Sequence, residues 1–124
     1  MERALEYIEG ILNGYKTKLN NIKSTLNEDY GILNFMERNA HDAVVCEFMV
    51  IELNLIKGIL LEKADKEEKV VSIQKRQKYF ENILLEGKAY RYTNSPSFNL
   101  AHLWVYETYP RIISIIIATL IHLK

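Results

Sequence analysis

The sequence is poor in cysteine and proline and carries no net charge. It has one cysteine and two prolines in 124 residues, and 16 lysine and arginine residues balance 16 aspartate and glutamate residues. One cysteine excludes an intrachain disulfide and gives no sign of an oxidising compartment. This residue, Cys46, lies in the apolar stretch 43–51, where we expect a small buried side chain. The neutral balance argues against broad electrostatic attraction to nucleic acid or anionic lipid.

A long apolar run is also missing. The longest, Ile112–Leu123, has twelve residues, whereas a membrane-spanning helix needs about twenty. A tail anchor would have to include the fairly apolar stretch 101–109, and that longer window contains Glu107 and Arg111. The first three residues lead directly into an amphipathic pattern, so we expect no signal peptide. We therefore predict a cytoplasmic protein without a membrane span.

What the sequence does contain is helical periodicity. Its 48% of hydrophobic residues is ordinary for a globular chain, and its length leaves room for one domain, 1–124. Apolar residues recur in steps of three and four, which predicts helices over Glu2–Asn27, Ile32–Ala64, Asp65–Glu86 and Pro96–Leu123. Turn-forming residues separate these stretches at 27–31 and 87–94. The predicted fold is all-α, an up-and-down four-helix bundle whose last helix is kinked at Pro110.

The second predicted helix is apolar on two opposite sides. One side carries His41, Val45, Phe48, Glu52, Leu55 and Ile59, and the other carries Met36, Ala40, Ala43, Val50, Ile51 and Leu61. A helix with this pattern is typically central, with neighbours packed on both sides. The alternative to a break near Asp65 is one continuous helix of over fifty residues, which is unusual for a small domain.

Two short motifs on this helix resemble catalytic families. His41-Asp42 resembles the phospho-accepting helix of two-component phosphotransferases, which requires an exposed histidine. The alternative is a histidine in the core or at its edge. Arg38-Asn39 followed by His41 resembles the motif of the HEPN ribonucleases, although fewer residues separate the arginine from the histidine than in that family. The second resemblance implies that Arg38 and His41 face an RNA phosphate.

The same helix offers a weak pattern for a metal. Glu37 and His41, at i,i+4, share one helix face. A carboxylate-bridged site needs a second such pair on a facing helix, and His102 and Glu107 are five residues apart and point in different directions. The sequence also contains no glycine-rich phosphate loop and no paired-cysteine zinc motif. We therefore predict neither a metal nor a cofactor.

Glu52 is the most informative single residue. It sits among apolar residues such as Phe48 and Leu55, so its carboxylate must be paired, hydrogen-bonded or protonated if it is buried. We expect it to face a groove or to meet Arg91, Arg111 or a tyrosine hydroxyl. The alternative is a perturbed acid in a ligand pocket. We predict that Glu52→Gln is nearly neutral or mildly stabilising, as expected when a buried charge is replaced by a neutral isostere.

Basic and aromatic residues gather on the third predicted helix and in the loop after it. They are Lys75, Arg76, Lys78, Tyr79, Tyr90, Arg91 and Tyr92. Such a combination binds single-stranded nucleic acid through backbone contacts and base stacking. The helix also carries four glutamates, so a solvated face of mixed charge is the alternative.

The C-terminal region has a surplus of apolar residues. From Tyr92 onward, 33 residues carry only Glu107, Arg111 and Lys124 as charges. If the last helix is an outer one, a partner must cover it, because its isoleucines occupy nearly its whole circumference. The alternative is that this helix is central in the monomer. We predict that the interface is formed by Trp104, Ile112, Ile113, Ile116, Ile117 and Leu120.

Taken together, these patterns favour a non-enzymatic interaction or assembly protein, either a homo-oligomer or the binder of another protein. The alternative is a small HEPN-like ribonuclease or nucleic-acid-binding bundle. In that case Arg38 and His41 would act together with a basic patch formed by Lys75, Arg76, Lys78 and Arg91. The candidate catalytic residues are Arg38, His41 and Glu52.

Overall fold

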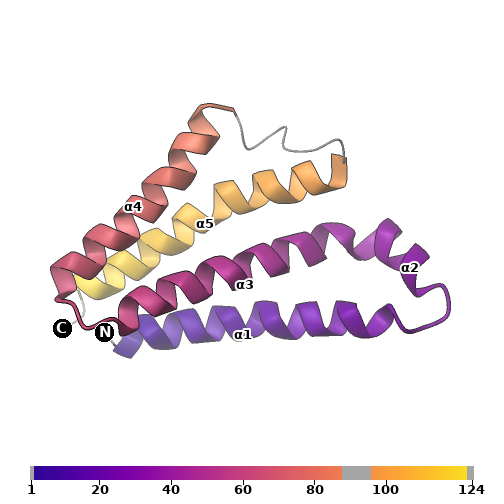
Figure 1. Cartoon of the computed structure of the whole chain (residues 1–124), viewed down its shortest axis with the longest axis horizontal. Helices are drawn as coiled ribbons and strands as arrows, with labels where there is room; N and C mark the ends of the chain where they lie inside the picture. The colour runs from indigo at the N-terminus through magenta and orange to yellow at the C-terminus, as the bar shows by residue number, and fades with distance from the viewer. Residues whose placement is uncertain (1, 88–95, 123–124) are drawn as a thin grey trace.

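In a computed structural model the chain forms a bundle of helices, and the structure describes residues 2–87 and 96–122. The elements are α1 (Glu2–Thr25), α2 (Gly31–Asn34), the π-helical turn η1 (Phe35–Asn39), α3 (Ala40–Leu61), α4 (Lys66–Leu85) and α5 (Pro96–His122) (Figure 1). No strand occurs in the described ranges. The predicted all-α bundle is confirmed, with four long helices.

The bundle consists of two helical hairpins packed side by side. Helix α1 lies along α3, α4 lies along α5, and the contact between α3 and α5 joins the two hairpins (Figure 1). The start of α1 and the end of α5 lie at the same end of the bundle, whereas α2 and η1 form the opposite end of the first hairpin. The chain thus alternates in direction from one long helix to the next, as predicted.

Local sequence signals explain where α4 begins and ends. The Asp65 side chain caps its N-terminus, because Oδ1 accepts a hydrogen bond from the Glu68 backbone N–H at 2.8 Å. The predicted break between the second and third long helices is therefore confirmed. Just past the other end, Gly87 has a φ of 73°, a left-handed conformation that glycine adopts at little cost.

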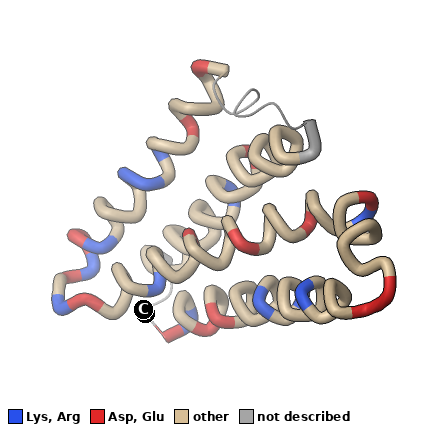
Figure 2. The backbone as a smooth tube through the Cα atoms, turned by 45° about the vertical axis from the view of Figure 1, so that its right-hand side comes forward, with Lys and Arg blue, Asp and Glu red and all other residues tan. Residues whose placement is uncertain are grey.

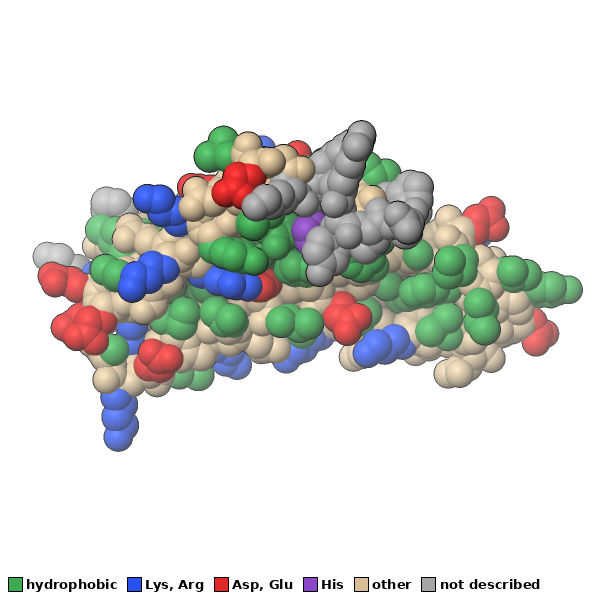
Figure 3. All heavy atoms as spheres, turned by 45° about the horizontal axis from the view of Figure 1, so that its top comes forward, with side chains coloured by type: hydrophobic (Ala, Val, Ile, Leu, Met, Phe, Trp, Pro, Cys, Tyr) green, Lys and Arg blue, Asp and Glu red, His purple; other side chains and the backbone are tan. Residues whose placement is uncertain are grey.

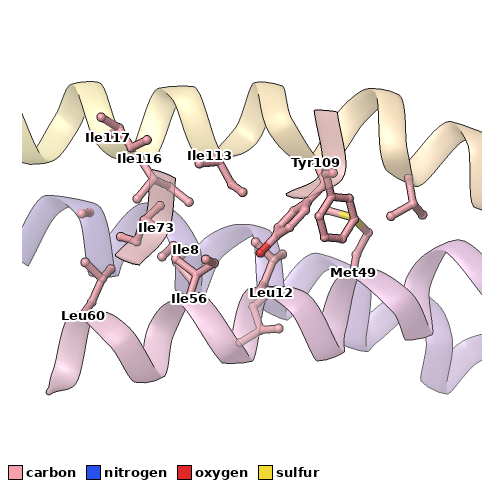
Figure 4. Close-up of a cluster of buried hydrophobic side chains, with 14 of the residues drawn as sticks. Ile8, Leu12, Met49, Ile56, Leu60, Ile73, Tyr109, Ile113, Ile116 and Ile117 are labelled. Atoms are coloured by element: carbon pink, nitrogen blue, oxygen red, sulfur yellow. The ribbon is translucent and has the colours of Figure 1, made fainter. Parts of the chain in front are cut away.

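The core lies where α3 and α5 meet, and α1 and α4 cover it. Its largest fully buried side chains are Ile8, Leu12, Met49, Leu53, Ile56, Leu60, Ile73, Phe80, Tyr109, Ile113, Ile116 and Leu120. Figure 4 shows that Ile113 and Ile116 point from α5 toward Ile56 of α3. This packing makes α5 a central helix. From the sequence, this arrangement was the alternative to an outer helix covered by a partner.

Helix α5 continues through Pro110. The proline has no N–H to donate, but its carbonyl accepts hydrogen bonds from Gln77 Nε2 at 2.9 Å and from Ser114 Oγ at 3.1 Å. Gln77 Nε2 also donates to Ser114 Oγ at 2.7 Å. Side chains of α4 and α5 therefore take part in the hydrogen bonding around the proline. The extent of the kink at this position stays a prediction.

The prediction that neighbours cover α3 on both apolar sides holds in part. Helices α1 and α5 both pack along α3. Each predicted side nevertheless combines buried and exposed residues. Val45 is buried but Leu55 on the same side is 42% exposed, and Ala43 is buried but Ile51 and Leu61 on its side are each 61% exposed. Some apolar side chains of α3 therefore remain uncovered.

Candidate functional site

Glu52 is buried, and it forms an ion pair with Arg76. The Glu52 side chain is 6% exposed, and that of Arg76 is 30% exposed. Arg76 Nε donates to Glu52 Oε2 at 3.0 Å, and Arg76 Nη2 donates to Oε1. The pair raises the pKa of Arg76 above its ordinary value. Because both carboxylate oxygens are occupied by a guanidinium, Glu52 is a structural anion here and not a free acid or base.

Tyrosine residues of α4 and α5 lie beside this ion pair. The Tyr109 hydroxyl donates to the Glu52 backbone carbonyl at 3.2 Å, and burial and the nearby Glu52 carboxylate raise its pKa. Burial, together with a hydrogen bond to Tyr79, raises the pKa of Tyr106 to about 12. Arg76 lies over the Tyr79 ring, with its Cζ 4.9 Å from the ring centroid. The raised pKa values of Tyr106 and Tyr109 keep both of these phenols protonated at neutral pH.

The structure corrects the partner expected for Glu52. A tyrosine hydroxyl was one of the predicted partners, and the Tyr109 hydroxyl does lie beside Glu52. The cation that binds the Glu52 carboxylate, however, is Arg76 from α4. Arg111 is exposed, and Arg91 lies outside the described residues. From the sequence, Arg76 was predicted to lie on a nucleic-acid-binding surface, because Lys75 and Lys78 stand on either side of it. The side chain points inward because α4 turns this position toward α3.

The other members of the predicted basic patch are dispersed. Lys75 and Lys78 are exposed on α4, and Arg91 lies outside the described residues. With Arg76 bound to Glu52, the described part of the patch has two free cations. Exposed glutamates of the same helix, such as Glu81, accompany them, and Figure 2 shows both charge signs along α4. Nucleic-acid binding at this helix stays a prediction.

His41 lies in a pocket of about 300 Å³ formed by α1, α3 and α5. Its lining consists of Tyr15, Lys18, His41, Asp42, Val45, Cys46 and Trp104. Asp42 Oδ1 is 3.5 Å from His41 Nδ1, and Asp42 Oδ2 is 3.5 Å from Lys18 Nζ. Cys46 is buried, as predicted, and burial raises the pKa of its thiol.

The structure separates the candidate catalytic residues. Arg38 is exposed on η1 and does not line the His41 pocket. Glu52 is engaged with Arg76 in a different part of α3 and does not line the pocket either. Arg38, His41 and Glu52 are thus not brought together in one cleft.

The predicted interface residues are mostly inside the protein. Ile113, Ile116 and Leu120 are 0% exposed, and Ile117 is 9% exposed, so a partner cannot reach them in this fold. Ile112 is half-buried against the core, and only Trp104, at 38%, is exposed. The error came from treating α5 as an outer helix, whereas α1, α3 and α4 all pack against it.

Several exposed apolar side chains gather instead at the turn between α1 and α3. This surface, here called the apolar tip, consists of Leu26, Tyr30, Ile32, Leu33 and Met36. Four of them are between 65% and 77% exposed, and Leu26 is 37% exposed. Figure 3 shows hydrophobic side chains clustered at the end of the molecule where α2 lies. This surface was not predicted from the sequence, although five apolar residues stand within the seven positions 30–36, more than one helix face can bury.

The backbone of the turn holds the apolar tip in place. Gly31 packs against the end of α1 so closely that a Cβ would lie 2.5 Å from the Leu26 carbonyl oxygen. Tyr30, just before it, has a φ of 60°, which is left-handed and unfavourable for a bulky residue. On the inner side, Phe35 packs against a small cluster that contains Leu19, and so anchors η1 to the hairpin. The exposed side chains therefore stand on an anchored turn.

No group of three or more histidine, cysteine, aspartate or glutamate side chains within 2–87 and 96–122 is placed to hold a metal ion. None of the described helices is both long and apolar enough to cross a membrane.

No family model, curated protein or solved structure matches this chain.

Proposed function

We propose that this protein is a non-enzymatic helical-bundle interaction module that binds another protein chain through the apolar tip. The observation that carries the proposal is the exposure of four large apolar side chains on consecutive turns, namely Tyr30 at 77%, Ile32 at 70%, Leu33 at 65% and Met36 at 67%. Monomeric proteins rarely expose contiguous apolar patches larger than a few hundred Å². A surface of this kind typically marks a binding site, because its burial against a partner releases ordered water.

Backbone strain at the same place supports the proposal. A left-handed conformation costs a non-glycine residue roughly 1–2 kcal/mol, and here Tyr30 adopts it while its side chain points into solvent. Strained backbone is often retained at functional sites, and so are π-helical turns such as Phe35–Asn39. A tyrosine held outward on a fixed turn also loses little side-chain entropy when a partner covers it.

Position-specific photo-crosslinking tests this proposal. A photoreactive phenylalanine analogue would be incorporated at Tyr30 in the expressing cell, and at Leu85 as a control, since Leu85 is 84% exposed on α4. We expect discrete adducts from position 30 that disappear when Leu33 and Met36 are changed to serine. The same adducts from both positions, or adducts that persist in the serine variant, would contradict the proposal.

A second candidate function is RNA cleavage or phosphotransfer at His41, and the observation that favours it is the pocket beside Lys18 and Asp42. On our proposal the protein cleaves no RNA. Metal-independent cleavage of an RNA panel, lost in His41→Ala with the fold intact, would support this candidate instead.

A further inference from the structure

The apolar tip has an acidic border. Glu28 and Asp29 precede Tyr30, and Glu37 follows Met36. All three carboxylate residues are exposed, and none of them forms an ion pair within the part of the chain that the structure describes. Arg38 is the one basic residue in the stretch 26–39. Figure 2 shows acidic positions at the turn between α1 and α2.

This border argues against a second copy of the chain as the occupant. In a two-fold symmetric contact the same patch lies on both sides, so two apolar tips with borders of net negative charge would meet. Like charges placed opposite each other weaken association and favour a partner of the opposite charge. The same argument disfavours an anionic membrane, whose headgroups attract basic and not acidic surfaces.

From the apolar tip and its acidic border we propose that the partner presents an amphipathic helix with lysine or arginine beside its apolar face. This inference rests on the proposed function and specifies the chemistry of its partner. The apolar side chains of that helix would cover Ile32, Leu33 and Met36, and its cations would pair with Glu28 and Glu37. Such charge pairs at the edge of an interface mainly speed up association and select the partner, while the apolar contacts hold the complex together.

A pair of synthetic helical peptides tests the proposal on the full-length protein. One peptide has leucine on one face and lysine on the other, and its counterpart has glutamate in place of lysine. Fluorescence anisotropy measures the binding of each labelled peptide at low and at physiological salt. We expect the lysine peptide to bind at least about tenfold more tightly than the glutamate peptide, with a difference that shrinks as salt screens the charges.

Two sets of variants identify the surface that binds. Glu28→Lys combined with Glu37→Lys should weaken the lysine peptide about tenfold, whereas Glu67→Lys combined with Glu68→Lys, on exposed positions of α4, should not. Leu33→Ser combined with Met36→Ser should abolish binding of the peptide. Circular dichroism confirms that each variant is folded before its affinity is interpreted.

Several outcomes would overturn the inference. These are equal affinity for the two peptides, no binding of either, an effect of the α4 charges equal to that of the tip charges, or binding to vesicles of phosphatidylserine that the serine variant loses. A mass above one chain in light scattering that falls to one chain in the serine variant would identify a second copy as the occupant. If the peptides fail while crosslinking from Tyr30 still gives discrete adducts, the partner chemistry is wrong and the proposed function stands.

Discussion

Arg76 on α4 binds Glu52 on α3 with two hydrogen bonds, and the pair connects the two helical hairpins across the bundle. We expect Glu52→Gln to lower the free energy of unfolding by about 2–3 kcal/mol, because the partly buried guanidinium loses its counter-charge. This reverses the expectation from sequence, in which no charged partner was fixed. Urea denaturation measures the effect.

A matched control and a double variant separate the ion pair from a general effect of charge. Glu47→Gln, at an exposed position of the same helix, should change stability by less than about 0.5 kcal/mol. Glu52→Leu combined with Arg76→Met should be more stable than Glu52→Leu alone, because no charge is left unpaired. Equal stability of Glu52→Gln and Glu47→Gln would show that the pair contributes nothing.

Two neighbouring isoleucines of α5 distinguish the core from the surface. Ile116 is 0% exposed and Ile115 is 48% exposed. We therefore expect Ile116→Asp to unfold the protein, since a carboxylate would be buried without a partner, and Ile115→Asp to remain folded. Circular dichroism and thermal melting measure both. A folded Ile116→Asp protein of lower mass than the wild type would instead restore the interface predicted from sequence.

Gly31 and Gly10 should respond to alanine in opposite directions. At Gly31 the added methyl group would collide with the Leu26 carbonyl, so Gly31→Ala should destabilise the protein by more than about 1 kcal/mol. At Gly10 nothing lies within 4 Å of the added carbon, and alanine in the middle of α1 should stabilise by about 0.5–1 kcal/mol. Denaturation midpoints compare the two. A neutral Gly31→Ala would mean that the turn is not held as described.

The buried phenol of Tyr106 predicts a loss of stability in alkali. Its pKa is raised from 10.0 to about 12, first by burial and then by Tyr79. The resulting stabilisation is fully present below pH 10 and is lost as the pH rises through about 12, because the folded chain retains a proton that the unfolded chain releases. Unfolding free energies from about pH 9 to about pH 11 should fall more steeply in the wild type than in Tyr106→Phe. Equal slopes would contradict the assignment.

Much of the local structure followed from the sequence. Apolar spacing located the four long helices and placed a break near Asp65, whose carboxylate caps α4 in the structure. The position of Glu52 within an apolar stripe predicted that it needed a partner, since an unpaired buried carboxylate is costly. These inferences succeeded because each depends on residues within a few turns of one another.

The tertiary structure decided which helix faces are covered. Periodicity orients side chains about the axis of their own helix, but it does not state which neighbour lies on each side. Two helices, α3 and α5, are apolar around most of their circumference, and sequence alone could not decide which of their faces are covered. In the fold, α5 is covered by three helices, so Ile113 and Ile116 are core residues, whereas Ile51 stays exposed. The partner of Glu52 and the exposure of the apolar tip were decided in the same way, because both depend on how hairpins distant in sequence pack together.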